Sequence, residues 1–298
     1  MRGMIVLLVL SALMMAAPPS QADTVYNSFP ANVEKRGDFG RFGPGYIREY
    51  AVFSVPVTSD FYFTGLDIAL GYRGGPNDMF IGLFADNANY PACALESFRL
   101  TDVVQPMASG GSIITLNSTL KPALKTSGKY WIGVWVADEA LTGMTWYHAQ
   151  SSVLGPGDSR ALYRGSAGWS LDAATMSFRV RGDKRVTIAI GPGSDTSSIN
   201  LSSRAIPVAV FGSNIFDVTS IDPQTVRLAG AQIMAVGRKR KLLSHYDDIN
   251  GDGYVDFVCQ VVTQQLILEP GVSTAFLEAL TYDGRHIRGE YSVLVLDH

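Results

Sequence analysis

The chain has 298 residues, of which 47% are hydrophobic and 17% are charged, and its formal net charge is -3. This length suffices for two domains that each bury a core, because domains usually contain roughly 100 to 200 residues. A net charge so close to zero gives the whole chain no field that gathers nucleic acid or anionic lipid, so neither is an expected partner.

The first 22 residues have the features of a secretory signal peptide. Arg2 supplies the positive start, residues 4–17 form an apolar stretch, and Ser20, Gln21 and Ala22 form a small-x-small cleavage site. An apolar stretch of about 14 residues is shorter than the roughly 20 that span a bilayer. We therefore expect cleavage after Ala22, a mature chain that starts at Asp23 without a membrane span, and secreted or periplasmic localisation.

Most of the mature chain alternates with period two or consists of short β-branched and aromatic runs, which predicts strands. The expected strands are residues 49–57, 60–70, 78–86, 111–117, 129–138, 176–182, 185–191, 206–212, 225–230, 254–262, 274–284 and 290–298. Turns rich in glycine and proline separate them, as at residues 73–78 and 154–158. The fold class is therefore predicted to be all-β, with two β-sandwich-like domains in tandem after the signal peptide.

The domain boundary is predicted next to Gly182, where one strand run ends and another begins at Arg185. The domains would be residues 23–182 and 185–298. Cys93 and Cys259 then fall in different domains, so no disulfide framework is expected within either one. The alternatives are two free thiols or one bridge between the domains.

The sharpest chemical signal is the sequence DINGDGYVD at residues 248–256. Ca²⁺ prefers six to eight oxygen ligands, which alternating carboxylates and amides on a curved loop can supply. We predict calcium binding by the side chains of Asp248, Asn250, Asp252 and Asp256 and by the backbone carbonyl of Tyr254.

The loop differs from an EF-hand after its ninth position. Cys259 stands where an EF-hand has a bidentate glutamate, and the residues that follow the loop are typical of a strand. Five protein ligands leave the rest of the shell to water or to another segment, with Asp217, Asp222 and Asp247 as candidates. Such a site would be structural, with a dissociation constant on the order of 0.1 to 1 mM. The alternative is a metal-free turn that caps its own backbone.

The C-terminal half resembles a β-domain of exported bacterial proteins that has no well-defined activity. The resemblance lies in residues 190–201, 206–213, 216–228 and 245–258, the last of which contains the DxNxDGxxD calcium loop. The N-terminal half is similar to the choice-of-anchor β-sandwich domains of exported bacterial proteins, through residues 53–70, 81–98 and 120–136. These resemblances imply two exported β-domains with a calcium loop in the second.

Aromatic residues in the N-terminal half suggest a carbohydrate contact. Trp146 and Trp169 are the candidates, because a flat ring can stack on the CH face of a sugar. The competing interpretation is that both rings belong to the core, which is the commoner place for aromatic residues of a sandwich.

No catalytic constellation stands out in the sequence. There is no G-x-S-x-G motif, and no two of the four histidines have zinc-site spacing. The preferred interpretation is an exported non-catalytic protein with structural Ca²⁺ and a polysaccharide or cell-surface partner, acting in binding or adhesion. The alternatives are an extracellular hydrolase of polysaccharides with an accessory calcium domain, and a purely structural matrix component.

Overall fold

The computed structural model describes residues 22–29, 39–42, 48–138, 140–147, 160–163, 168–172, 175–193 and 198–296. The predicted signal peptide lies outside these ranges, apart from Ala22. The regular structure in the described residues is β-strand except for three short 3-10 turns, which are η1 (Met107–Ser109), η3 (Val218–Ser220) and η4 (Thr263–Gln265). The predicted all-β fold class is confirmed.

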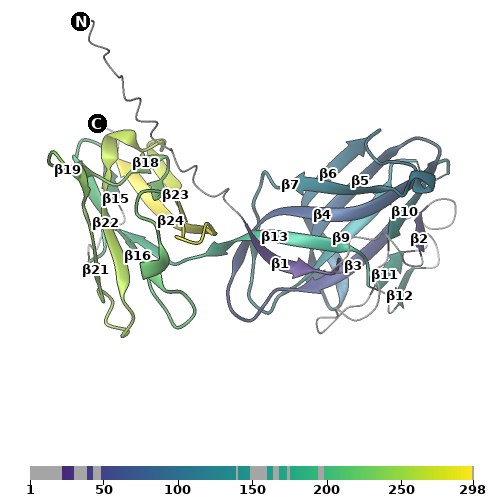
Figure 1. Cartoon of the computed structure of the whole chain (residues 1–298), viewed down its shortest axis with the longest axis horizontal. Coiled ribbons are helices and arrows are strands. Elements are labelled where there is room, and N and C mark those ends of the chain that lie inside the picture. The colour runs from purple at the N-terminus through teal and green to yellow at the C-terminus, as the bar shows by residue number, and fades with distance from the viewer. Residues whose placement is uncertain are drawn as a thin grey trace, which may run out of the picture.

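The first lobe consists of two packed sheet layers (Figure 1). One layer contains β1 (Asp23–Asn27), β2 (Phe39–Phe42), β4 (Phe61–Gly74), β7 (Ser112–Asn117), β8 (Ala123–Leu124), β10 (Gly143–Tyr147) and β13 (Phe178–Arg185). The other has the order β12 (Trp169–Asp172), β11 (Arg160–Tyr163), β3 (Arg48–Ser54), β9 (Lys129–Val136), β5 (Asp78–Asn87) and β6 (Tyr90–Thr101). Alternate residues of β4, β5 and β9 meet in one hydrophobic cluster between the layers, which includes Phe63, Ile81 and Val134.

The second lobe has its own hydrophobic cluster, which includes Val208, Phe257 and Leu277. One set of its strands contains β15 (Ser198–Asn200), β17 (Arg227–Leu228), β18 (Ala231–Gln232), β23 (Gly271–Leu280) and β24 (His286–Leu296). A separate sheet has the order β14 (Ile188–Ile190), β16 (Ala205–Val210), β22 (Asp256–Val262) and β21 (Ser244–Asp247). A small hairpin is formed by β19 (Ala235–Val236) and β20 (Lys241–Leu242).

Strand β13 connects the two lobes (Figure 1). It pairs antiparallel with β4 as far as Lys184 opposite Phe61. It also pairs parallel with β24, where Lys184 lies opposite Ile287 and Arg185 opposite Arg288. One sheet therefore runs from the first lobe into the second.

Gly182 lies within β13 and does not end the strand, which continues to Arg185. The register against β4 shifts between Arg181 and Gly182, so the glycine marks a bulge. A Cβ atom at this position would lie 2.7 Å from Cγ2 of Val25 and 3.0 Å from the carbonyl oxygen of Tyr62. The residues predicted to separate two domains are thus part of the strand that joins the lobes.

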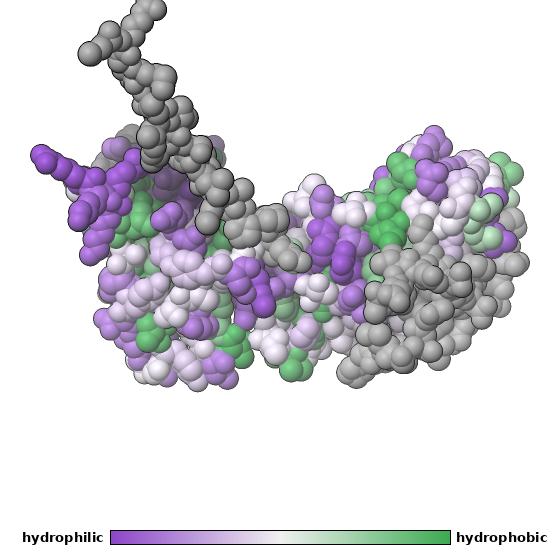
Figure 2. Space-filling view, viewed as in Figure 1, coloured by the Kyte–Doolittle hydropathy of each residue, from purple (hydrophilic) through white to green (hydrophobic). Residues whose placement is uncertain are grey.

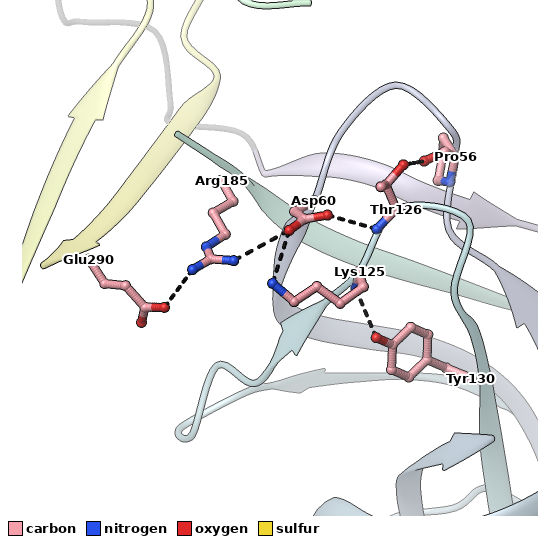
Figure 3. A network of polar contacts seen from close by, with 7 residues as sticks. All are labelled: Pro56, Asp60, Lys125, Thr126, Tyr130, Arg185 and Glu290. Carbon is pink, nitrogen blue, oxygen red and sulfur yellow. Dashed lines mark hydrogen bonds and ion pairs between the residues drawn. The ribbon is translucent and has the colours of Figure 1, made fainter. Parts of the chain in front are cut away.

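A polar network crosses the junction beside β13 (Figure 3). Asp60 accepts hydrogen bonds from the Thr126 backbone N–H at 2.8 Å and from Lys125 Nζ at 3.2 Å. Arg185 donates through Nη1 to Asp60 at 3.3 Å and through Nη2 to Glu290 of the second lobe at 2.8 Å. Burial alone would raise the pKa of Asp60, but these donors outweigh it and lower that pKa. Arg185 therefore bridges one carboxylate of each lobe.

Candidate calcium loop and aromatic surface

The predicted calcium loop is the tip of the hairpin formed by β21 and β22. Asp247 lies opposite Asp256 at the last paired position, so the residues between them form the connection. Gly251 and Gly253 have φ values of 76° and 87°, a conformation that glycine adopts without a steric penalty. The prediction that this loop leads into a strand and not into a helix is confirmed.

The Asp248 side chain organises the loop from within. Its Oδ1 accepts hydrogen bonds from the backbone N–H groups of Gly251 at 2.8 Å and Asp252 at 3.2 Å. Its Oδ2 accepts from the N–H of Gly253 at 2.9 Å. Three consecutive amides therefore point at one carboxylate, which curves the backbone tightly around it.

Asn250 and Asp252 add side-chain oxygens to the exposed part of the loop. Asn250 Oδ1 accepts from the Asp252 N–H at 3.0 Å, and Asp252 Oδ1 accepts from the Tyr254 N–H at 2.9 Å. Asn250 Nδ2 also donates to Asp252 Oδ2 at 3.0 Å.

Asp256 differs from the other predicted ligands because its side chain is fully buried. Its Oδ2 accepts from the Ile249 N–H at 3.0 Å, within the loop, and its Oδ1 accepts from the Gly212 N–H at 2.9 Å, outside it. Gly212 leaves no room for a side chain, since a Cβ atom there would lie 2.2 Å from the Val255 carbonyl oxygen. Asp256 thus fastens the loop to the end of β16, a role that the spacing of the motif did not reveal.

The donor set of the loop has the chemistry that calcium requires, because carboxylate, amide and carbonyl oxygens are its preferred ligands. However, no group of three or more His, Cys, Asp or Glu side chains in the described ranges is arranged to hold a metal ion. A site would therefore depend on the Asn250 oxygen and the Tyr254 carbonyl as well as on the aspartates. Two of the additional candidates cap their own backbone, since Asp217 accepts from the Thr219 N–H and Asp222 from the Gln224 N–H.

The two candidate glycan contacts have different environments. Trp146 is 0% exposed, and its Nε1 donates to the Ser177 carbonyl at 3.2 Å, inside the core of the first lobe. A fully buried ring has no face to offer a sugar, so the prediction for Trp146 is wrong. Trp169 is 40% exposed and lies on the edge strand β12, so its ring is accessible.

Trp169 belongs to a row of aromatic residues on the outer face of its sheet, and this row was not predicted from the sequence. Its ring centroid lies 5.3 Å from that of Tyr50 and 5.8 Å from that of Tyr90. Further along the same face, the rings of Phe80 and Trp135 stack with centroids 5.4 Å apart. The available signal was that β5 and β9 each have two aromatic residues on one face, but alternation does not say which face is covered.

A charged cavity of about 680 Å³ lies beside the junction of the lobes. Asp183 and Glu278 both line it. Burial raises the pKa of Asp183, whereas Glu278 forms ion pairs with Lys121 at 3.3 Å and with Arg288. The cavity thus contains one carboxyl group whose pKa is raised by burial and a second one that lies between two cations.

Both cysteines are free thiols in this structure, Cys93 exposed and Cys259 buried in β22. Burial raises the pKa of the Cys259 thiol to about 12, which makes it a poor nucleophile. The structure therefore corresponds to the prediction of two free thiols, without a bridge between the lobes.

The fold and these sites define an all-β protein with a carboxylate-rich hairpin loop and an aromatic sheet face. No protein-family model matches the chain, and no curated protein matches it in sequence. No helix among the described residues is long and apolar enough to cross a membrane.

Proposed function

We propose that this is an exported, non-catalytic protein that binds a polysaccharide or another cell-surface polymer and whose second lobe is stabilised by calcium. The observation that carries the binding function is the 40% exposed ring of Trp169 on the outer face of the first lobe, with the exposed ring of Tyr90 beside it. Flat rings supported by a rigid sheet suit sugar rings, because they offer apolar area at little cost in conformational entropy. The role in adhesion follows if the bound polymer belongs to a cell surface.

Calcium would be held by Asp248, Asn250, Asp252, Asp256 and the Tyr254 carbonyl, and it would act on stability and not on chemistry. The support is the donor set and the curvature that Asp248 imposes on the loop. The bound ion would fix the tip of the hairpin of β21 and β22, one of whose strands runs through the core of the second lobe.

Retention of the mature chain, residues 23–298, on a panel of polysaccharides tests the binding function. We expect retention on at least one polymer and loss of retention in Trp169→Ala, because that change removes the accessible ring. Val272→Ala, which shortens an 81% exposed side chain of the second lobe, is the control and should bind like wild type. Absence of retention on every polymer would rule out the glycan function and direct the search to a protein partner.

Calcium binding is tested separately, by measuring retention and melting temperature in calcium and in chelator. Asp252→Ala should abolish calcium binding, whereas Glu269→Ala, which removes another exposed carboxylate of the second lobe, should leave it intact. Retention that is lost in chelator would connect the ion to polymer binding. Retention that persists, with a melting temperature that still depends on calcium, would leave the ion structural.

The second candidate function is hydrolysis of an extracellular polysaccharide. It is favoured by the cavity that contains Asp183 and Glu278, since glycosidases use two carboxyl groups that flank the scissile bond. Release of reducing ends from the same polymers, measured for wild type and Asp183→Asn, decides it. Activity that disappears in the variant would establish the enzyme, and no release by wild type would exclude it for those polymers.

A further inference from the structure

The hairpin of β19 and β20 carries a run of four basic residues, which we call the basic turn: Arg238, Lys239, Arg240 and Lys241. The Arg240 N–H donates to the Gly237 carbonyl at 3.1 Å, which closes a tight turn with two of the basic residues at its centre. Gly237 and Arg240 both have positive φ, at 72° and 50°. The turn therefore holds the start of each basic side chain in a defined position.

All four residues of the basic turn are exposed. Figure 2 shows a strongly hydrophilic protrusion at the place where Figure 1 labels β19. None of the four side chains forms an ion pair or a hydrogen bond with another described residue, whereas Arg99, Arg185 and Arg288 are each paired with a carboxylate. The basic turn is thus a local cluster of uncompensated positive charge.

This cluster acts as a positive site although the chain as a whole has a net charge of -3. Exposed charges interact over a distance of about 8 Å at physiological ionic strength, so distant carboxylates do not cancel those of the turn. Four cations on consecutive residues repel one another, and a polyanion that approaches them removes this repulsion.

We propose that the basic turn binds an anionic polysaccharide, which rests on the proposed glycan-binding function and specifies its ligand class. Guanidinium groups pair with the carboxylate or sulfate groups of such a polymer through two parallel hydrogen bonds. None of the large apolar side chains that are exposed lies in residues 235–242, so the hairpin has nothing to insert into a bilayer. The hairpin also contains no aromatic residue on which a nucleic-acid base could stack.

The test measures binding of the mature chain to polygalacturonate, with dextran as an uncharged polymer and with anionic phospholipid vesicles and double-stranded DNA as other polyanions. The variant is Arg238→Gln combined with Lys239→Gln. Its matched control is Arg73→Gln combined with Arg204→Gln, which changes the net charge equally at two other exposed positions. Melting temperatures of both variants verify that they are folded.

We expect the hairpin variant to bind polygalacturonate about tenfold more weakly than wild type, while the control variant retains wild-type affinity. Binding by wild type should also weaken as NaCl rises from about 0.05 to 0.5 M. Equal losses in the two variants would show an effect of net charge alone and would overturn the proposal, as would tighter binding of vesicles or DNA than of polygalacturonate. Binding of dextran without polygalacturonate would overturn it while leaving glycan binding intact, and binding of neither would remove both.

Discussion

At the scale of single residues, the clearest structural role belongs to Asp256. Its two oxygens accept hydrogen bonds from the backbone N–H groups of Gly212 and Ile249, and the carboxylate has no exposure to water. The spacing of the sequence motif predicted that this residue is a metal ligand. It could not show that the same carboxylate holds the loop against β16, because Gly212 is distant in the sequence.

Asp256→Ala should therefore destabilise the protein even without calcium. Two buried or partly buried backbone N–H groups would lose their acceptor, and we expect the free energy of unfolding to fall by about 2 to 4 kcal/mol. Urea denaturation in the presence of a chelator measures this quantity. Asp247→Ala is the control, because Asp247 accepts only from the neighbouring Asp248 N–H and is exposed. Equal stability losses in the two variants would contradict the bridging role of Asp256.

Asp183 should make the stability of the protein depend on pH. Burial raises the pKa of this carboxyl group in the folded state above its ordinary value, and the neighbouring His286 and Lys121 only partly oppose that shift. Below the unfolded pKa the group is protonated in both states, and its contribution to stability is lost as the pH rises through the folded pKa. As the pH rises from about 4, the free energy of unfolding of Asp183→Asn should therefore decrease less than that of wild type. Parallel pH profiles of wild type and variant in urea denaturation would contradict this assignment.

At the scale of elements, 12 of the 24 strands in the described residues were predicted, and most of those that were missed are short. The edge strand β6 was not predicted because only Glu96 is buried along it, so its sequence lacks regular alternation. β13 was predicted to end at Gly182, because a glycine in a strand-like sequence is typical both of a bulge and of a strand end. The exposure of Trp146 was predicted wrongly, because alternation shows on which face of β10 a side chain lies but not whether another layer covers that face.

The junction beside β13 gives a prediction about the coupling of Arg185 and Glu290. Their side chains are 27% and 35% exposed, so solvent screens their interaction in part. A double-mutant cycle with Arg185→Ala and Glu290→Ala should give a coupling energy of about 0.3 to 1 kcal/mol at low salt. This energy should decrease in about 0.5 M NaCl, because salt screens partly exposed charges. A coupling energy of zero at low salt would show that the ion pair does not contribute to stability in solution.

At the scale of the whole molecule, the lobes have separate hydrophobic clusters but share a sheet through β13. The calcium loop and the basic turn both belong to the second lobe, whereas the aromatic face belongs to the first. A polymer chain long enough to reach both lobes could contact the aromatic face and the basic turn together. Binding at two linked sites would then be tighter than at either one, since the second contact forms within the complex.

Calcium should raise the melting temperature through the second lobe. With a dissociation constant on the order of 0.1 to 1 mM, about 1 mM calcium would stabilise the folded state by roughly 0.4 to 1.4 kcal/mol. This stabilisation corresponds to a rise of about 2 to 6 °C in calorimetry. Asp252→Ala should show no rise, while Glu269→Ala should behave like wild type, because only the first change removes a loop oxygen.

The same experiment shows whether the two lobes unfold together. If calcium raises the melting temperature of the first lobe as much as that of the second, the shared strand β13 transmits the stabilisation and the chain unfolds as one unit. A wild-type melting temperature that is the same in calcium and in chelator would contradict stabilisation by calcium. The loop would then be a metal-free turn held by Asp248 and Asp256.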